Sequence, residues 1–284
     1  MFSKIISIIL SDFGLKKTDS IFLEVLSDIH WGHRGFDTFR YEQAVNRIAK
    51  NKNRFTLFLG DQIDAINIYD KRFNPDTVVE HDIDNQTMGW QKASQPLFDI
   101  QEKMKEGSYP NCTNEKVWGL EHGNHEYNVK GITRPYIENR FCSPNNVDFL
   151  GARAHIGVRI FENRKTFKKD EALAEWSIAL MHGSGGGTPE NMFREMKKNW
   201  NADIYICGHL HQKMSKEELV YDFDWETGKS YARPIYLVNA GTFQNTLTNE
   251  YDGYMDRKNG IVATGIGTQT LELNAWENKV NLHG

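Results

Sequence analysis

Five short apolar runs in this sequence are each followed at once by aspartate, asparagine or histidine, in most cases beside a glycine. The polar groups are Asp28 with His30, Asp61 with Asp64, Asn124 with His125, His182 alone, and His209 with His211. Apolar runs of this length predict buried strands, and in an open α/β sheet ligands bind at the carboxyl ends of the strands. We therefore expect the five groups to meet at one edge of the fold.

The residue types in these groups suit a metal site. Carboxylate and amide oxygens, together with imidazole nitrogens, are common ligands of divalent transition metals. Alternate residues of an extended chain point the same way, so Asp28 with His30, and His209 with His211, would each present two ligands to one place. A single histidine or Gly-Asp pair after a strand indicates only a turn, but five such groups in order favour a site.

The apolar runs that must position these groups are of strand length. They span 21–27, 54–60, 116–121, 176–181 and 202–207, and a sixth run of the same kind spans 234–240. Most are apolar on both faces, which is typical of strands covered on both sides. Helical patterns occupy 38–51 and 188–200, and strand-like runs at 219–225, 233–239, 260–266 and 270–276 dominate the second half. The alternation of strands and helices predicts an α/β fold.

One long connection separates the second and third apolar runs. Residues 66–115 contain helix-like stretches but no obvious core strand, and so long a connection is usually functional. We interpret it as a largely helical insertion beside the active face of a single domain spanning 1–284. Its aromatic and basic residues suit base stacking and phosphate contact. They are Tyr69, Lys71, Arg72, Phe73, Trp90 and Lys92.

Composition and charge limit the classes of protein. The chain has 284 residues, of which 39% are hydrophobic and 25% charged, as is ordinary for a globular protein. A net charge of −4 gives no basic footprint for broad nucleic-acid binding. Three cysteines at unrelated spacings indicate neither a disulfide framework nor a thiolate metal site. The run IISIIL is too short for a signal peptide or a membrane span, so we expect a cytoplasmic protein without a membrane partner.

The ordered motifs resemble those of the calcineurin-like metallophosphoesterase superfamily, and the run HGSGGGTP at 182–189 is similar to its prokaryotic and phage members. The set is Asp28-x-His30, Gly60-Asp61-x-x-Asp64, Gly123-Asn124-His125-Glu126, His182 and Gly208-His209-x-His211, followed by the turn NAGTF at 239–243. The resemblance implies a metallophosphoesterase-type four-layer α-β-β-α sandwich that holds two metals.

The resemblance also implies a role for each polar residue. Asp28, His30 and His211 would bind the first metal, and Asn124, His182 and His209 the second, with Asp61 as the bridge between them. His125 would be the catalytic group near the leaving group of the substrate, and Asp64 would orient His125.

This arrangement predicts an enzyme. Two cations roughly 3.5–4 Å apart can bind a phosphate and generate hydroxide from water near neutral pH. We expect two divalent metal ions, Mn²⁺ in preference to Fe or Zn²⁺. The expected function is hydrolysis of a phosphoester, more specifically by a phosphodiesterase or nuclease acting on nucleic acid or a nucleotide. One alternative is a phosphomonoesterase acting on a protein, nucleotide or small molecule. The other is a non-catalytic metal-binding scaffold.

Overall fold

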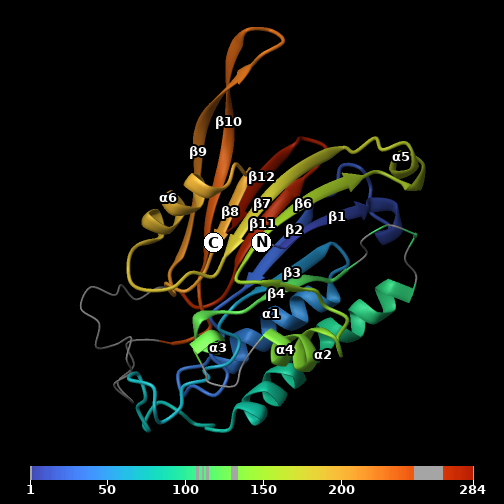
Figure 1. Cartoon of the computed structure of the whole chain (residues 1–284). Helices are drawn as coiled ribbons and strands as arrows, with labels where there is room; N and C mark the ends of the chain where they lie inside the picture. Colours follow the sequence, from blue (N-terminus) through green and yellow to red (C-terminus); the bar gives the residue numbers. More distant parts are fainter. Residues whose placement is uncertain are drawn as a thin grey trace.

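Two six-stranded sheets face each other at the centre of the protein (Figure 1). The structure is a computed structural model that describes residues 2–106, 109–110, 112, 115–128, 134–245 and 265–283. Sheet A has the order β1 (Phe2–Ile9), β6 (Arg153–Phe161), β7 (Ala174–Met181), β8 (Ile204–Cys207), β10 (Lys229–Ala240) and β9 (Lys213–Asp224). Sheet B has the order β12 (Lys279–His283), β11 (Gln269–Asn274), β2 (Ile21–Leu26), β3 (Arg54–Leu59), β4 (Val117–Glu121) and β5 (Phe149–Gly151).

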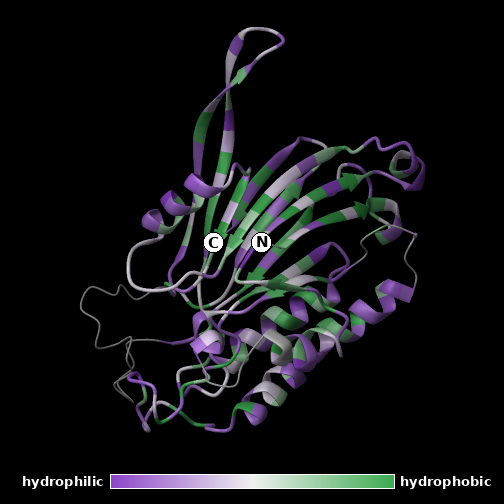
Figure 2. Ribbon diagram, viewed as in Figure 1, coloured by the Kyte–Doolittle hydropathy of each residue, from purple (hydrophilic) through white to green (hydrophobic). Residues whose placement is uncertain are grey.

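The main core fills the space between the two sheets. Alternate residues of β6, namely Ile156, Val158 and Ile160, point into it and are fully buried, as expected for strands with a side-chain period of two. Figure 2 shows the hydrophobic residues concentrated on the strands. All six predicted core strands are confirmed, but β1, β5 and β6 were not predicted. The run IISIIL, which reads as too short to span a membrane, lies mainly in β1.

Helices cover the outer faces of both sheets (Figure 1). Sheet B is covered by α1 (Thr38–Lys50) and α2 (Ile83–Glu106), and sheet A by α6 (Pro189–Asn199). Within the described residues, the remaining helical segments are a 3₁₀ turn at Leu10–Phe13, α3 (Asn124–Asn128), α4 (Arg134–Ile137), a π turn at Glu138–Cys142 and α5 (Arg164–Lys168). The predicted four-layer α-β-β-α arrangement is therefore confirmed. Among the described residues, no helix combines the length and the apolar character that crossing a membrane requires.

The segment 66–115 divides into two parts with different surroundings. Helix α2 packs on sheet B, and the Trp90 ring lies 5.1 Å from the Phe58 ring, centroid to centroid. Trp90 is fully buried, so the expectation that it stacks on a substrate base is wrong. The residues before α2 instead reach the carboxyl ends of the strands, where Lys71 and Arg72 line a cavity.

The hairpin of β9 and β10 extends beyond the rest of sheet A (Figure 1). Its two strands pair from Lys229 opposite Asp224 to Ala240 opposite Lys213. The turn after β10 reaches back to sheet B, because Thr242 donates its hydroxyl hydrogen to the carbonyl oxygen of Asp28 at 2.8 Å. Of the strand-like run at 260–266, residues 260–264 lie outside the described residues.

Candidate active site

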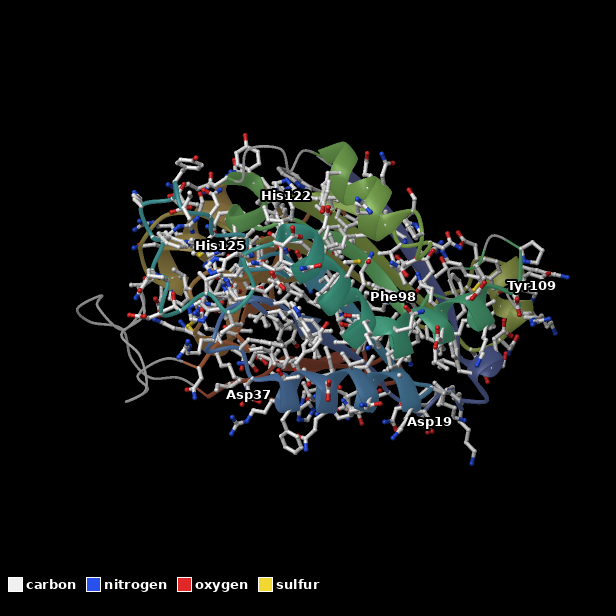
Figure 3. The ribbon with its side chains drawn as sticks, turned by 90° about the horizontal axis from the view of Figure 1, so that it is seen from below. Asp19, Asp37, Phe98, Tyr109, His122 and His125 are labelled. Carbon is white, nitrogen blue, oxygen red and sulfur yellow. The ribbon has the colours of Figure 1, made fainter. Side chains whose placement is uncertain are left out.

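The five polar groups follow the carboxyl ends of five strands at one edge of the two sheets. In sheet B, Leu59 at the end of β3 pairs in parallel with Glu121 at the end of β4. In sheet A, Met181 at the end of β7 pairs in parallel with Cys207 at the end of β8. These registers align the loops that follow each strand. Figure 3 shows His122 and His125 together at this edge, far from Tyr109 at the other end of the molecule.

Asp28, His30 and His211 form the first cluster of ligand atoms. Nε2 of His30 lies 3.0 Å from Nε2 of His211, and Nε2 of His211 lies 3.2 Å from Oδ1 of Asp28. All three residues are buried. Two imidazole nitrogens and one carboxylate oxygen that point at one another are a donor set for a divalent cation.

Asp61, His182 and His209 form the second cluster of ligand atoms. Nε2 of His182 lies 3.2 Å from Oδ2 of Asp61 and 3.3 Å from Oδ1 of Asn124. Nδ1 of His182 lies 2.6 Å from the carbonyl oxygen of Leu59, which accepts its proton and orients Nε2 toward Asp61. Burial by itself would lower the pKa of His182, but the charges of Asp61 and Asp28 raise it to about 10, so a cation that binds Nε2 displaces a proton. The structure thus brings together all seven residues that the sequence suggests as ligands.

Asp61 lies between the two clusters. Its Oδ2 atom is 3.2 Å from Nε2 of His182 and 3.8 Å from Nε2 of His30, while its Oδ1 atom accepts the backbone N–H of His125. Burial by itself would raise the pKa of Asp61, but the nearby His182 and His125 lower it well below its usual value. The carboxylate is therefore ionised and ready to bind cations.

The Asp28 carboxylate, like that of Asp61, is held in place by hydrogen bonds to one of its two oxygens. Its Oδ2 atom accepts hydrogen bonds from the Ser27 hydroxyl at 2.6 Å and from the His209 backbone N–H at 3.0 Å. Its Oδ1 atom is buried and faces Nε2 of His211 at 3.2 Å, without a well-aligned hydrogen bond among the described residues. A buried carboxylate oxygen whose hydrogen bonding is incomplete is costly unless a cation binds it. The residues present therefore fit a metal.

The backbone at the ligand positions is left-handed. Five of the seven ligand candidates have positive φ, and they are Asp28, His30, Asp61, His209 and His211, with φ between 49° and 69°. For residues other than glycine this conformation is uncommon and is concentrated at functional sites. It also corrects the geometric argument from the sequence, because these segments are not extended. His209 and His211 accordingly contribute to different clusters.

Two glycines allow the loops to come this close. A Cβ atom on Gly123 would lie 1.9 Å from Oδ1 of Asp61, and one on Gly60 would lie 2.5 Å from Nδ1 of His182. Gly60 also has a φ of +90°, which disfavours any other residue. The glycines beside the polar groups therefore serve close packing around the ligands.

Glu126 holds two of the loops together, a role that the sequence did not suggest. Its buried carboxylate accepts backbone N–H groups from Asp61, Gln62 and Ile63 in one loop. It also accepts the N–H of Gly123 in the other. Burial and the charge of Asp61 raise the pKa of Glu126 to about 7. The only sequence signal was an acidic residue directly after Asn124-His125.

His125 lies beside Asp61, the carboxylate between the two clusters. Its Nε2 atom is 4.0 Å from Oδ2 of Asp61, and its Nδ1 atom is 2.5 Å from the backbone carbonyl oxygen of Asp64. Burial lowers the pKa of His125 to about 4, although the Asp61 charge acts in the opposite direction. The ring is therefore neutral at pH 7 before a substrate binds.

Asp64 is close to two histidines. Its carboxylate Oδ1 atom lies 3.4 Å from Nδ1 of His30 and 3.8 Å from Nδ1 of His125. Burial raises the pKa of Asp64 well above its usual value. Asp64 lies beside His125, as the sequence suggests. Its backbone carbonyl group makes the closer contact with His125, and its carboxylate lies farther away.

An open cavity of about 880 Å³ gives access to both clusters. His125 and the basic residues Lys71 and Arg72 line it. Arg72 is held by an ion pair with Asp70, at 2.6 Å between Nη2 and Oδ2. Asp70 lines the cavity as well and offsets the Arg72 charge. The cavity therefore combines metal-ligand atoms with two basic side chains that can contact an anionic substrate.

Comparison with known proteins decides the family. A model described as calcineurin-like phosphoesterase matches residues 25–213, a range that includes every residue of both clusters. The chain belongs to the calcineurin-like phosphoesterase family. It is accordingly a metal-dependent phosphoesterase, a hydrolase whose substrate is a phosphoester. A search of curated proteins finds no match to this phosphoesterase.

Several solved structures are similar to this phosphoesterase. Vps29 from Entamoeba histolytica, solved with zinc, is 14% identical with a TM-score of 0.39, covering 93% of this chain and 97% of its own. Vacuolar protein sorting 29 from Cryptosporidium parvum is 14% identical with a TM-score of 0.40 and coverage of 93% and 96%. A metallophosphoesterase from Sphaerobacter thermophilus is 12% identical with a TM-score of 0.35 and coverage of 93% and 88%. With TM-scores this low, the likenesses add nothing to the family match.

Proposed function

We propose that this phosphoesterase is a phosphodiesterase with a dinuclear centre. The observation that carries the proposal is the position of Asp61, whose Oδ2 atom faces His182 of one cluster and His30 of the other. A single carboxylate oxygen between two donor sets is suited to bridging two cations. Asp28, His30 and His211 would hold one ion, and Asn124, His182 and His209 the other.

The donor set favours Mn²⁺, with Fe or Zn²⁺ as alternatives. All the ligand atoms are oxygen or imidazole nitrogen, and thiolate ligands, which select zinc in structural sites, are not among them. Cys207 precedes the loop of His209 but is fully buried in the core, where burial raises the pKa of its thiol. When bound, two such cations supply charge that holds phosphate oxygens and lowers the pKa of water.

The residues of the chain supply the remaining chemistry. His125 lies next to the clusters and lines the cavity, where it can provide a proton or a hydrogen bond to the leaving oxygen. Arg72 and Lys71 line the same cavity and can neutralise phosphate charge. A diester carries a substituent on each side of the phosphate, and the open cavity leaves room for both.

Phosphodiester hydrolysis by loaded protein tests this proposal. The chelated protein is reloaded with Mn²⁺, and its turnover of bis-p-nitrophenyl phosphate is compared with that of p-nitrophenyl phosphate. We expect a higher kcat/KM on the diester and close to two bound ions per chain. Preference for the monoester would favour phosphatase activity instead, and no turnover of either ester would favour a binding scaffold.

Asp61→Asn probes the bridge in the same experiment. Loss of one negative charge between the clusters should weaken both metal sites and abolish most turnover. Asp222→Asn is the matched control, because Asp222 pairs with Arg233 on the remote hairpin. If Asp61→Asn keeps both ions and full activity, the bridging role is wrong.

A further inference from the structure

A second cavity of about 590 Å³ adjoins the active-site cavity. Asn124, Gly186 and Gly187 line both cavities, and His182 lines the second. His125 lines the active-site cavity alone. A group in the second cavity would therefore lie beside the second ligand cluster but away from the residue proposed to serve the leaving group.

One wall of the second cavity ends in a stack of aromatic rings. The Tyr127 ring lies 5.5 Å from the His122 ring, centroid to centroid, with 10° between their planes. The His122 ring lies 5.7 Å from the Phe149 ring at 16°. Tyr127 is 72% exposed although it belongs to this column. A planar ring bound against Tyr127 would extend the stack by one member.

The second cavity is also lined by apolar side chains and by the positively charged side chain of Arg153. Met181, Met192 and Trp200 contribute the apolar surface. Arg153 lies at the start of β6, is exposed, and lines the cavity. Within the described part of the chain no carboxylate forms an ion pair with Arg153. Its guanidinium group is therefore available to an oxygen of a ligand.

We propose that the second cavity binds the nucleoside portion of the substrate that stays on the phosphate after hydrolysis. The nucleobase stacks on Tyr127, and Arg153 donates hydrogen bonds to oxygens of that nucleotide. This inference rests on the proposed phosphodiesterase function and names its substrate class, a nucleotide diester. The oxygen of water bonds to phosphorus, the P–O bond to the leaving group breaks, and the leaving oxygen takes up a proton. The product in the second cavity is a nucleoside monophosphate.

Calorimetric titration of the Mn²⁺-loaded full chain with adenosine 5′-monophosphate and ribose 5-phosphate tests the base site. Both probes carry the same phosphate, so the ratio of their affinities isolates the base. We expect the wild type to bind adenosine 5′-monophosphate more tightly. Because stacking on an aromatic side chain strengthens binding considerably, Tyr127→Ala should reduce that ratio roughly tenfold.

Two further tyrosine variants distinguish stacking from a general disturbance. Tyr127→Phe keeps the ring and should retain the ratio. Tyr221→Ala removes an equally exposed tyrosine from the remote hairpin, where Tyr221 is 78% exposed, and should leave both affinities unchanged. Equal loss of affinity for both probes in Tyr127→Ala would contradict a base site, because only one probe carries a base.

Arg153→Gln tests the positive charge of Arg153 independently of the Tyr127 ring. We expect weaker binding of adenosine 5′-monophosphate and a shallower dependence of that affinity on salt concentration, because one charged contact is lost. Arg40→Gln is the control, since Arg40 is exposed on α1, pairs with Asp37 and lines neither cavity. An unchanged salt dependence in Arg153→Gln would overturn the role of Arg153.

The outcomes separate this inference from the proposed function. If the wild type hydrolyses bis-p-nitrophenyl phosphate but binds both probes equally, the base site is wrong and the diesterase function stands. If the wild type prefers adenosine 5′-monophosphate in a Tyr127-dependent way but hydrolyses no diester, the base site stands and the function is wrong. Release of inorganic phosphate from adenosine 5′-monophosphate would also count against a diesterase.

Discussion

Nδ1 of His125 lies 2.5 Å from the backbone carbonyl oxygen of Asp64, whereas the Asp64 carboxylate stays 3.8 Å from the same nitrogen. Because a carbonyl oxygen only accepts hydrogen bonds, Nδ1 carries the proton. Nε2 of His125 then carries a proton only when the ring is cationic. The Asp64 carboxylate lies nearer to Nδ1 of His30, at 3.4 Å. Asp64 therefore contacts one histidine through its backbone and the other through its side chain.

Asp64→Asn should separate these two contacts. The backbone carbonyl group that accepts from His125 remains, while His30 loses the carboxyl group beside its Nδ1 atom. Because removing such a partner of a metal-binding histidine weakens the site, we expect roughly 10–100-fold lower metal affinity, measured by competition with a chelator. Sensitivity of the rate to the leaving group should stay as in the wild type. A sensitivity as steep as that of His125→Ala would show that the carboxylate serves His125.

His125→Ala should lower turnover roughly 10²–10⁴-fold on esters with poor leaving groups, because a proton donor is lost. The metal content should remain that of the wild type, since His125 belongs to neither of the two clusters proposed to hold the metals. A series of aryl phosphodiesters with leaving groups of increasing pKa measures the effect. The deficit should shrink as the leaving-group pKa falls, and a constant deficit across the series would rule out proton donation.

The contribution of His125 should depend on pH in a defined direction. Burial lowers the pKa of His125 to about 4, so the cationic form that can donate from Nε2 becomes scarcer as the pH rises. We expect the ratio of wild-type to His125→Ala turnover on a poor leaving group to fall between about pH 6 and pH 8. Taking the ratio at each pH cancels the loss of metal that both proteins share. A ratio that rises with pH would identify His125 as a base.

Gly123→Ala should disable the metal centre without touching a ligand. The added Cβ atom would lie 1.9 Å from Oδ1 and 2.3 Å from the backbone nitrogen of Asp61, so Asp61 must move. Loss of bound metal, measured by elemental analysis, is the expected result. Gly157→Ala in β6 is the matched control, because its Cβ atom would meet only Ile5 at 3.8 Å. Retention of metal by Gly123→Ala would mean that the loop tolerates a shift of Asp61.

The convergence of the polar groups could be predicted from the sequence, because strand ends are local features. Asp28 and Asp61 each follow an apolar run, and parallel pairing brings such ends together whatever the details of the loops. The left-handed backbone at these residues could not be predicted, since it depends on loops from other strands. The hydrogen bond from His209 to Asp28 joins residues 181 positions apart, and no local pattern encodes it.

Trp90 illustrates an error that the sequence could have avoided. Trp90, Leu97 and Phe98 recur at helical spacing and form the buried face of α2. That periodicity indicates a helix packed on the core, whereas composition alone suggested a substrate-binding insertion. Glu126 shows the opposite case, because its four backbone partners come from two loops and a single acidic residue carries no signal for such a role.

The candidate ligands come from both sheets, and this has a consequence for how the protein unfolds. Asp28, His30, Asp61 and Asn124 follow strands of sheet B, whereas His182, His209 and His211 follow strands of sheet A. A cation held by ligands of both sheets is a cross-link between the two halves of the core, so separating the sheets requires releasing it. Because binding only to the native state adds to stability, the metals would couple the opening of one sheet to that of the other. Amide hydrogens of β3 and β8 would then exchange through one shared opening in the loaded protein, and through separate openings once chelation removes the cross-link.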